Sequence, residues 1–465
     1  MKKFLIAGVV VIGGAVLAAP YLIGTHAEGR FTQGHEWLQQ EILYPQVSVQ
    51  PGEYRKGWLT SETSTRFSFT PAGEGEAPLS FELVHHINQI PSPMGMMRIE
   101  SELALPPEMA EKLEGHLRGG PLLSAETVVG FDGNATTTLT SPGYSGPLQS
   151  GERVQLDWRG LEGTFNSDGK MGHITASLTA PGLSIKDGEG SVTLSRMHYN
   201  TDLVRGAYDL WFGTADATLE GIEFDVETPE NGPARMQMSK ARLTTEQHED
   251  DTRVDIDGKL TFETFEVNGF NVSDGIYEVA YHNLDAASLG QLNTTLKQIM
   301  HEQPQDPSLL VDSMKSHVQG LLSQKPELSI RQLRIETPMG TVSGKLHMVL
   351  TDPLTDAMMQ NPIMLMDILR VDLDASLPKP MVMGLLSSSA RNSVTQIAKT
   401  QGRSLSSEEV TERSNALMQQ QLQGLLAQQL MVEQGENYLT SIHYARHKLM
   451  INDQDATPMI GALLQ

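Results

Sequence analysis

The chain has 465 residues, of which 39% are hydrophobic and 20% are charged, and it contains no cysteine. This composition is typical of a folded protein with one large or two to three smaller domains. The net charge of −23 argues against binding nucleic acid or anionic lipid through a basic face. The absence of cysteine excludes thiolate nucleophiles, cysteine-ligated zinc, iron–sulfur clusters and disulfides.

An uncharged stretch of membrane-spanning length, Phe4–Ile23, lies at the start of the chain. A helix needs roughly 20 apolar residues to cross the hydrocarbon, whereas a cleaved secretion signal has an apolar region of about 7–15 residues. We therefore expect residues 1–25 to form a retained transmembrane anchor, and a signal cleaved near Ala19 is the alternative. Lys2 and Lys3 precede the stretch, which predicts a cytoplasmic N-terminus and export of the remaining chain.

Residues 26–45 have helical spacing and predict a short stalk that ends at a proline. From residue 46 onward the apolar side chains recur with a period of two, in short runs bounded by turn residues. This pattern predicts antiparallel strands that are apolar on one face and polar on the other. One interruption, residues 106–117, has helical spacing. We expect residues 46–284 to form a β-rich periplasmic part.

Helical spacing returns at Asp285, so residues 285–465 predict a mixed α/β part. Ser406 and Glu409 match a capping box at the start of the last long helix, and Gly435 matches its stop.

Helices within residues 285–324 and 354–432 are expected to pack on the apolar face of the sheet. The fold class is therefore predicted to be α+β. It comprises a transmembrane helix and a large, mostly antiparallel, one-sided sheet that is covered by C-terminal helices.

Several segments spread along nearly the whole chain resemble the YdgA-like family of bacterial proteins. They are the N-terminal anchor, Tyr54–Leu59 with Ser61, LVHHINQIPSP, LWFG, PMGTVSGKLHM and MVEQGENYLTSIHYARHKLMIND. The sequence departs from the family pattern at Asn88–Ile90, where a glycine is expected soon after the histidines. The resemblance implies an inner-membrane anchor, a large periplasmic part and no established activity. The predicted one-sided sheet also resembles the architecture of AsmA-type envelope proteins, which are associated with lipid traffic.

Two short glycine-containing motifs lack residues that catalysis would need. In Gly143–Pro147 (GYSGP), proline stands where a nucleophile elbow requires its second glycine. Gly340–Lys345 (GTVSGK) is too short for a phosphate-binding loop and is not followed by serine or threonine. We interpret the first as a turn and the second as part of a strand–turn–strand unit.

The histidines and acids predict no metal site. His443 and His447 would lie about 13 Å apart along one strand face, which is too far to share one ion. His85 and His86 are adjacent, so in a strand one side chain faces inward and the other faces solvent. The clustered acids are interpreted as solvated turns: Glu246, Glu249, Asp250, Asp251, Asp453 and Asp455. We therefore predict no catalytic residue, no cofactor-binding residue and no metal ligand.

Methionine is abundant, with 23 residues, many of them in the segments expected to be helical. Methionine fills gaps in ordinary cores, and it also lines adaptable apolar grooves. A glutamine-rich face of the last long helix would meet either water or a second copy of the chain. It comprises Gln419, Gln420, Gln421, Gln423, Gln428 and Gln429.

Two hypotheses for function follow, both for a non-enzymatic protein tethered to the inner membrane by Phe4–Ile23. In the first, the protein has a structural or interaction role in envelope assembly, as a homodimer or with other envelope proteins. In the second, it carries lipid or another apolar molecule. An unrecognised enzyme is the third reading. A fully covered apolar sheet face would favour the first hypothesis, and an open face would favour the second.

Overall fold

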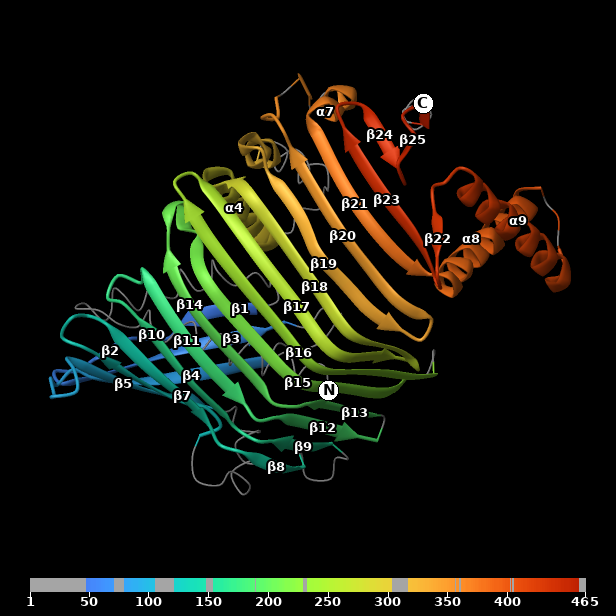
Figure 1. Cartoon of the computed structure of the whole chain (residues 1–465). Helices are drawn as coiled ribbons and strands as arrows, with labels where there is room; N and C mark the ends of the chain where they lie inside the picture. The colour runs from blue at the N-terminus through green and yellow to red at the C-terminus, as the bar shows by residue number, and fades with distance from the viewer. Residues whose placement is uncertain are drawn as a thin grey trace. The chain divides into compact units, whose positions relative to one another are not determined.

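The computed structural model describes residues 47–70, 79–104, 121–147, 154–188, 190–228, 232–302, 317–355, 357–358, 361–401, 403 and 405–459. Figure 1 shows the whole chain. The chain divides into two compact units. Unit 1 comprises Met1–Thr252, Glu266–Gly269 and Ala286–Val318, and unit 2 comprises Arg253–Phe265, Phe270–Asp285 and Gln319–Gln465. The expected anchor (1–25), stalk (26–45) and helix (106–117) lie outside the described residues. Within the described ranges, no helix is long and apolar enough to cross a membrane.

Unit 1 is built from antiparallel strands in which apolar and polar residues alternate. The order β1–β3–β4–β5–β6–β7–β10–β11–β14–β15–β16 forms one series, and β8–β9–β12–β13 joins it at β15. The elements are β1 (Val47–Pro51), β2 (Arg55–Lys56), β3 (Thr60–Phe69), β4 (Leu79–Asn88), β5 (Met97–Ala104), β6 (Ser124–Val129), β7 (Ala135–Ser141), β8 (Tyr144–Pro147), β9 (Gln155–Trp158), β10 (Leu161–Ser167), β11 (His173–Ala180), β12 (Leu183–Asp187), β13 (Gly190–Leu194), β14 (Met197–Arg205), η2 (Ala207–Asp209), β15 (Trp211–Thr228), β16 (Gly232–Asp250) and α4 (Ala286–Glu302).

Unit 2 has the antiparallel order β18–β19–β20–β21–β23–β24–β25, and β22 pairs with β23. Its elements are β17 (Arg253–Val267, apart from the last two residues), β18 (Phe270–Asp285), η3 (Leu322–Gln324), β19 (Glu327–Thr337), β20 (Gly340–Leu350), α7 (Pro362–Ile368), β21 (Leu369–Pro378), α8 (Lys379–Thr400), α9 (Ser407–Ala427), β22 (Val432–Gln434), β23 (Asn437–Ala445), β24 (Lys448–Ile451) and β25 (Gln454–Asp455).

The mostly antiparallel sheet and the C-terminal helices confirm the coarse prediction. The capping box at Ser406 and Glu409 is confirmed, because each residue's side chain bonds the other's backbone N–H. The stop assigned to Gly435 is wrong. Helix α9 already ends at Ala427, and Gly435 forms the turn between β22 and β23 with φ of 57°. The physical reason is that a hairpin turn and a helix stop both favour a residue with positive φ.

A row of buried polar side chains crosses the apolar interior of unit 1. On β4 it contains His85, between Leu83 of one apolar cluster and Ile87 of another. The row continues through Thr65, Ser101, Thr127 and Thr137 on the neighbouring strands. His85 Nε2 lies 2.9 Å from Thr65 Oγ1, and His85 Nδ1 lies 2.7 Å from Ser101 Oγ. Hydrogen bonding lets this row remain buried without a large desolvation cost.

Substituting His85→Ala is expected to reduce the free energy of unfolding by about 2–5 kcal/mol. It deprives two buried hydroxyls of a partner and leaves a cavity. Urea unfolding of the full chain, followed by circular dichroism, measures the loss. His86→Ala is the matched control, because His86 is exposed beside Glu62 at 3.3 Å and its loss should cost less than about 1 kcal/mol. Equal losses for the two variants would contradict a structural role for the buried row.

Candidate apolar binding surface

One face of the unit 2 sheet carries continuous rows of apolar side chains across its strands. Antiparallel pairing aligns Val279, Ile330, Leu346, Leu373 and Ile442, one residue from each of β18, β19, β20, β21 and β23. Adjacent strands lie about 4.8 Å apart, so this row extends about 19 Å. It is one line of apolar contacts with no charged residue in it.

A second row runs parallel to the first, two residues further along each strand. It aligns Tyr281, Leu328, Met348, Val371 and Tyr444. We call these ten residues the unit 2 apolar face.

Most side chains of the unit 2 apolar face keep partial contact with solvent. All members of the first row are half-buried, and Tyr281 in the second row is 41% exposed. A covering layer would bury such side chains almost completely, as unit 1 buries Phe67 and Ile99 to 1% and 0% exposure. Tyr444, which contacts α7, is buried at 6% exposure, and the described elements of unit 2 cover the other nine residues only in part.

The helices of unit 2 lie at the ends of its strands. Near α7, Leu350, Leu354 and Ile368 form a small buried cluster, and Tyr444 Oη donates to the Met366 carbonyl at 2.9 Å. Helix α8 begins directly after β21, and Figure 1 shows α8 and α9 beside the end of that strand. The expectation that these helices cover the sheet is therefore not met within the described part of unit 2. Helices α8 and α9 pack against each other as a hairpin. Their buried residues include Ala390, Val394 and Met418.

Unit 1 carries a related row on its own sheet. Pairing aligns Trp158, Leu183, Leu194, Ile222 and Met238 on β9, β12, β13, β15 and β16. All five side chains are half-buried. Half-exposed apolar rows are therefore a property of both units.

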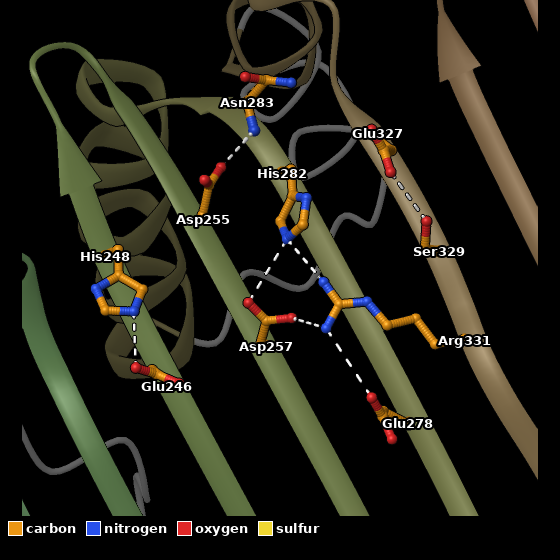
Figure 2. Close-up of polar contacts among 10 residues, drawn as sticks. All are labelled: Glu246, His248, Asp255, Asp257, Glu278, His282, Asn283, Glu327, Ser329 and Arg331. Atoms are coloured by element: carbon orange, nitrogen blue, oxygen red, sulfur yellow. Dashed lines mark hydrogen bonds and ion pairs between the residues drawn. The ribbon is translucent and has the colours of Figure 1, made fainter.

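The opposite face of unit 2 is polar, and its charges pair with one another. Figure 2 shows Arg331 among acids from the neighbouring strands. It lies 2.6 Å from Asp257 and 4.0 Å from Glu278, and it donates to His282 Nε2 at 3.3 Å. Lys259 lies 3.4 Å from Glu278. Arg331 falls at a register shift in β19, where the chain has additional residues opposite β20. The bulge brings Arg331 to this face beside the acids.

A second polar group lies on β21 and β23. Asp372 is bonded to His443 Nδ1, and its other oxygen accepts from Arg370 at 3.0 Å. Burial alone would raise the pKa of Asp372, but the hydrogen bond from His443 and the charge of Arg370 together hold this pKa below its ordinary value.

The same face has a pocket of about 880 Å³ over β19, β20, β21 and β23. Its lining includes Arg334, Lys345, Asp374 and Asp453, which have both signs of charge. Arg334 is bound to Glu336 at 2.8 Å. The pocket thus has no convergent set of acids or nucleophiles of the kind that a reaction would use.

The motifs weighed from sequence fall in ordinary strands and turns. Gly340–Lys345 starts β20 after a turn, which confirms the strand–turn–strand interpretation. The interpretation of Gly143–Pro147 as a turn is wrong, because Tyr144–Pro147 forms β8 and pairs with β9. His85 is buried and His86 is exposed, as expected for a strand.

The remaining candidates are also separate from one another. His443 bonds Asp372, whereas His447 lies in the turn after β23 and bonds Asp367. The interpretation of the acids as a turn is wrong for Glu246, Glu249 and Asp250, because they lie in β16, and Asp251 lies in the turn that follows it. Asp453 lies in the turn before β25, and Asp455 belongs to that strand. No group of three or more potential metal ligands occurs within the described ranges.

Sequence reasoning missed the site itself. The alternation in LSIRQLRI and KLHMVL shows which residues share a face, but it does not show whether that face is covered. Three of the ten face residues are aromatic or methionine: Tyr281, Met348 and Tyr444. They lie in strands, whereas the methionines singled out from the sequence lie mainly in predicted helices.

A model of the bacterial protein family of unknown function DUF945 matches residues 1–459. No curated protein matches the chain. No solved structure matches it either.

The lowered pKa of Asp372 predicts how the free energy of unfolding should change at acid pH. Its pKa in the folded state lies below the unfolded value of about 3.9, so its stabilisation is complete above about pH 4 and is lost as pH falls through the folded pKa. Asp372→Asn should therefore lose less stability than wild type when urea midpoints at pH 5 and pH 3 are compared. Asp374→Asn removes another carboxylate from the same strand and face and is the control for the loss of a charge. A wild-type response in Asp372→Asn would contradict the coupling.

Proposed function

We propose that this chain, which belongs to the DUF945 family of bacterial proteins of unknown function, binds acyl chains or similarly apolar molecules along its sheet. The observation that supports this proposal is the partly exposed apolar face of unit 2. Soluble monomers rarely expose contiguous apolar patches beyond a few hundred Å², and larger ones mark interaction sites.

The chemistry of the face favours an apolar chain as the occupant. The strands β19, β20 and β21 are paired on both sides, so their backbone N–H and C=O groups are used within the sheet. A ligand lying on this face therefore finds apolar side chains and almost no hydrogen-bonding groups. Tyr281, at one end of its row, supplies a hydroxyl. A mostly apolar surface with a few polar groups is what ligands of this class require.

The predicted location is consistent with this ligand. The anchor expected at Phe4–Ile23 would hold the protein at the bacterial inner membrane, with its N-terminus in the cytoplasm and its bulk in the periplasm. That location, the YdgA-like affiliation and the absence of enzymatic activity are parts of the proposal. A structural or interaction role is the second candidate, because the same open face is suited to a second copy or another envelope protein.

A photo-crosslinking amino acid placed on either face of β20 and β21 tests the proposal. In full-length protein in its native membrane, the probe at Leu346 or Leu373 should form adducts with the mass of a lipid. The probe at the adjacent Lys345 or Asp374 points to the polar face and should form none. Mass spectrometry of the irradiated protein makes the measurement.

The other outcomes separate the candidate functions. Protein adducts from Leu346 and Leu373, without lipid adducts, would replace the carrier with the interaction role. Equal lipid labelling from both faces, or no adduct from either, would contradict a specific apolar binding face.

A polar substitution on the unit 2 apolar face should weaken the binding of an apolar ligand. Leu346→Gln removes apolar area worth about 1–2 kcal/mol, which corresponds to a roughly five- to thirty-fold weaker affinity for a fluorescent fatty acid. Lys345→Gln should leave the affinity unchanged. Circular dichroism checks that both variants fold, and equal affinities for the two would count against this face.

A further inference from the structure

Five large apolar side chains project from one end of the unit 1 sheet. Trp58 is 94% exposed, Met94 72%, Phe131 69%, Leu59 52% and Ile90 48%. We call them the loop-tip cluster. They lie in three connections, β2–β3, β4–β5 and β6–β7.

These connections are neighbours along the same edge of the sheet. Thr60 at the start of β3 pairs with Asn88 at the end of β4, and the Gln89 N–H donates to the Leu59 carbonyl at 2.9 Å. The Met96 N–H donates to the Val129 carbonyl at 2.7 Å, which joins the second connection to the end of β6. The three tips therefore form one contiguous surface.

The backbone beneath the cluster is fixed and its interior is filled. Ile87, Met97, Ile99, Val129 and Ala135 form a buried apolar cluster at this end of the strands. The turn that carries Phe131 is closed by the Gly130 N–H, which donates to the Asn134 carbonyl at 2.8 Å. The exposed side chains therefore remain outside a core that is already packed.

We propose that the loop-tip cluster inserts into the interfacial layer of a phospholipid bilayer. The five side chains belong to turns that neighbour one another along one edge, so they can enter a bilayer side by side. A bilayer needs no matching shape of the kind that a folded partner needs. Tryptophan is enriched at membrane interfaces because its ring is amphipathic.

The charges near the cluster are of both signs. Arg55 lies 3.4 Å from Glu53, and the carboxylate of Asp132 accepts from Asn134. With a net charge of −23 on the whole chain, insertion depends on apolar area and not on attraction to anionic lipid.

The segment between the predicted anchor and β1 is long enough for the loop-tip cluster to reach the bilayer. The predicted anchor ends at Ile23 and β1 begins at Val47, and the residues between them span at most about 80 Å. A tether of this reach allows the cluster to meet the same bilayer. The inference does not require that the apolar faces bind lipid.

The absence of cysteine permits a direct test in the full-length chain. Single variants Met94→Cys and Phe131→Cys are labelled with an environment-sensitive dye and reconstituted into phosphatidylcholine vesicles that contain nitroxide-labelled lipid. Ser80→Cys is the control, because Ser80 is exposed toward the opposite end of β4. Urea midpoints confirm that each variant folds.

Both tip labels should shift to shorter wavelength and lose most of their emission to nitroxides placed near the headgroups, and the Ser80 label should do neither. Added salt should leave the quenching unchanged. Adding Trp58→Ser to the Met94→Cys variant should reduce the quenching. Tip labels as solvent-exposed as the Ser80 label would overturn the proposal. A blue shift without quenching by lipid nitroxides would also overturn the proposal, and so would a blue shift that is present before vesicles are added. Either result would indicate a protein partner or a second copy of the chain.

Discussion

The register of antiparallel pairing is the constraint on which the other features of this protein depend. In unit 2, Leu346 is opposite Ile330 on one neighbouring strand and Leu373 on the other, and Lys345 is opposite Asp374. Side chains alternate between faces, so a slip of one residue would put lysine among the leucines and leucine among the acids. Both the apolar rows and the polar network of Arg331 and Asp257 exist only in the observed register.

Buried polar groups and paired charges also specify this register. In unit 1, His85 bonds hydroxyls on both neighbouring strands, so a shifted pairing would leave these groups buried without partners. In unit 2, the bulge at Arg331 realigns the polar face while Ile330 and Leu333 remain on the apolar face. The exposed ion pairs of unit 2 add little net stability, but they make alternative pairings less favourable.

The sequence predicted the strands and long helices better than it predicted their burial. Periods of two and of 3.6 residues are local properties, so the β-rich part, α8 and the start of α9 at Ser406 could be derived from spacing and capping. Whether a helix lies across a sheet depends on contacts between distant segments, which spacing does not contain. For this reason the open face at Leu346 and Leu373 could not be derived, and neither could the shared edge of Trp58, Ile90 and Phe131. Gly435 was misplaced because its positive φ suits a hairpin turn as well as a helix stop.

The two units differ in where their apolar residues are buried, which has a consequence for stability. Unit 1 encloses Phe67, Leu83, Leu139 and others in a core formed between its own strands. The central strands of unit 2 present Ile330, Leu346 and Leu373 half-buried. Part of the apolar surface that usually stabilises a folded sheet is therefore still in contact with water in unit 2. Any molecule that occupies this face binds the folded state and not the unfolded chain, so occupancy and stability of unit 2 are thermodynamically linked. If this face binds an apolar ligand as proposed, the stability of unit 2 should therefore increase with the concentration of that ligand.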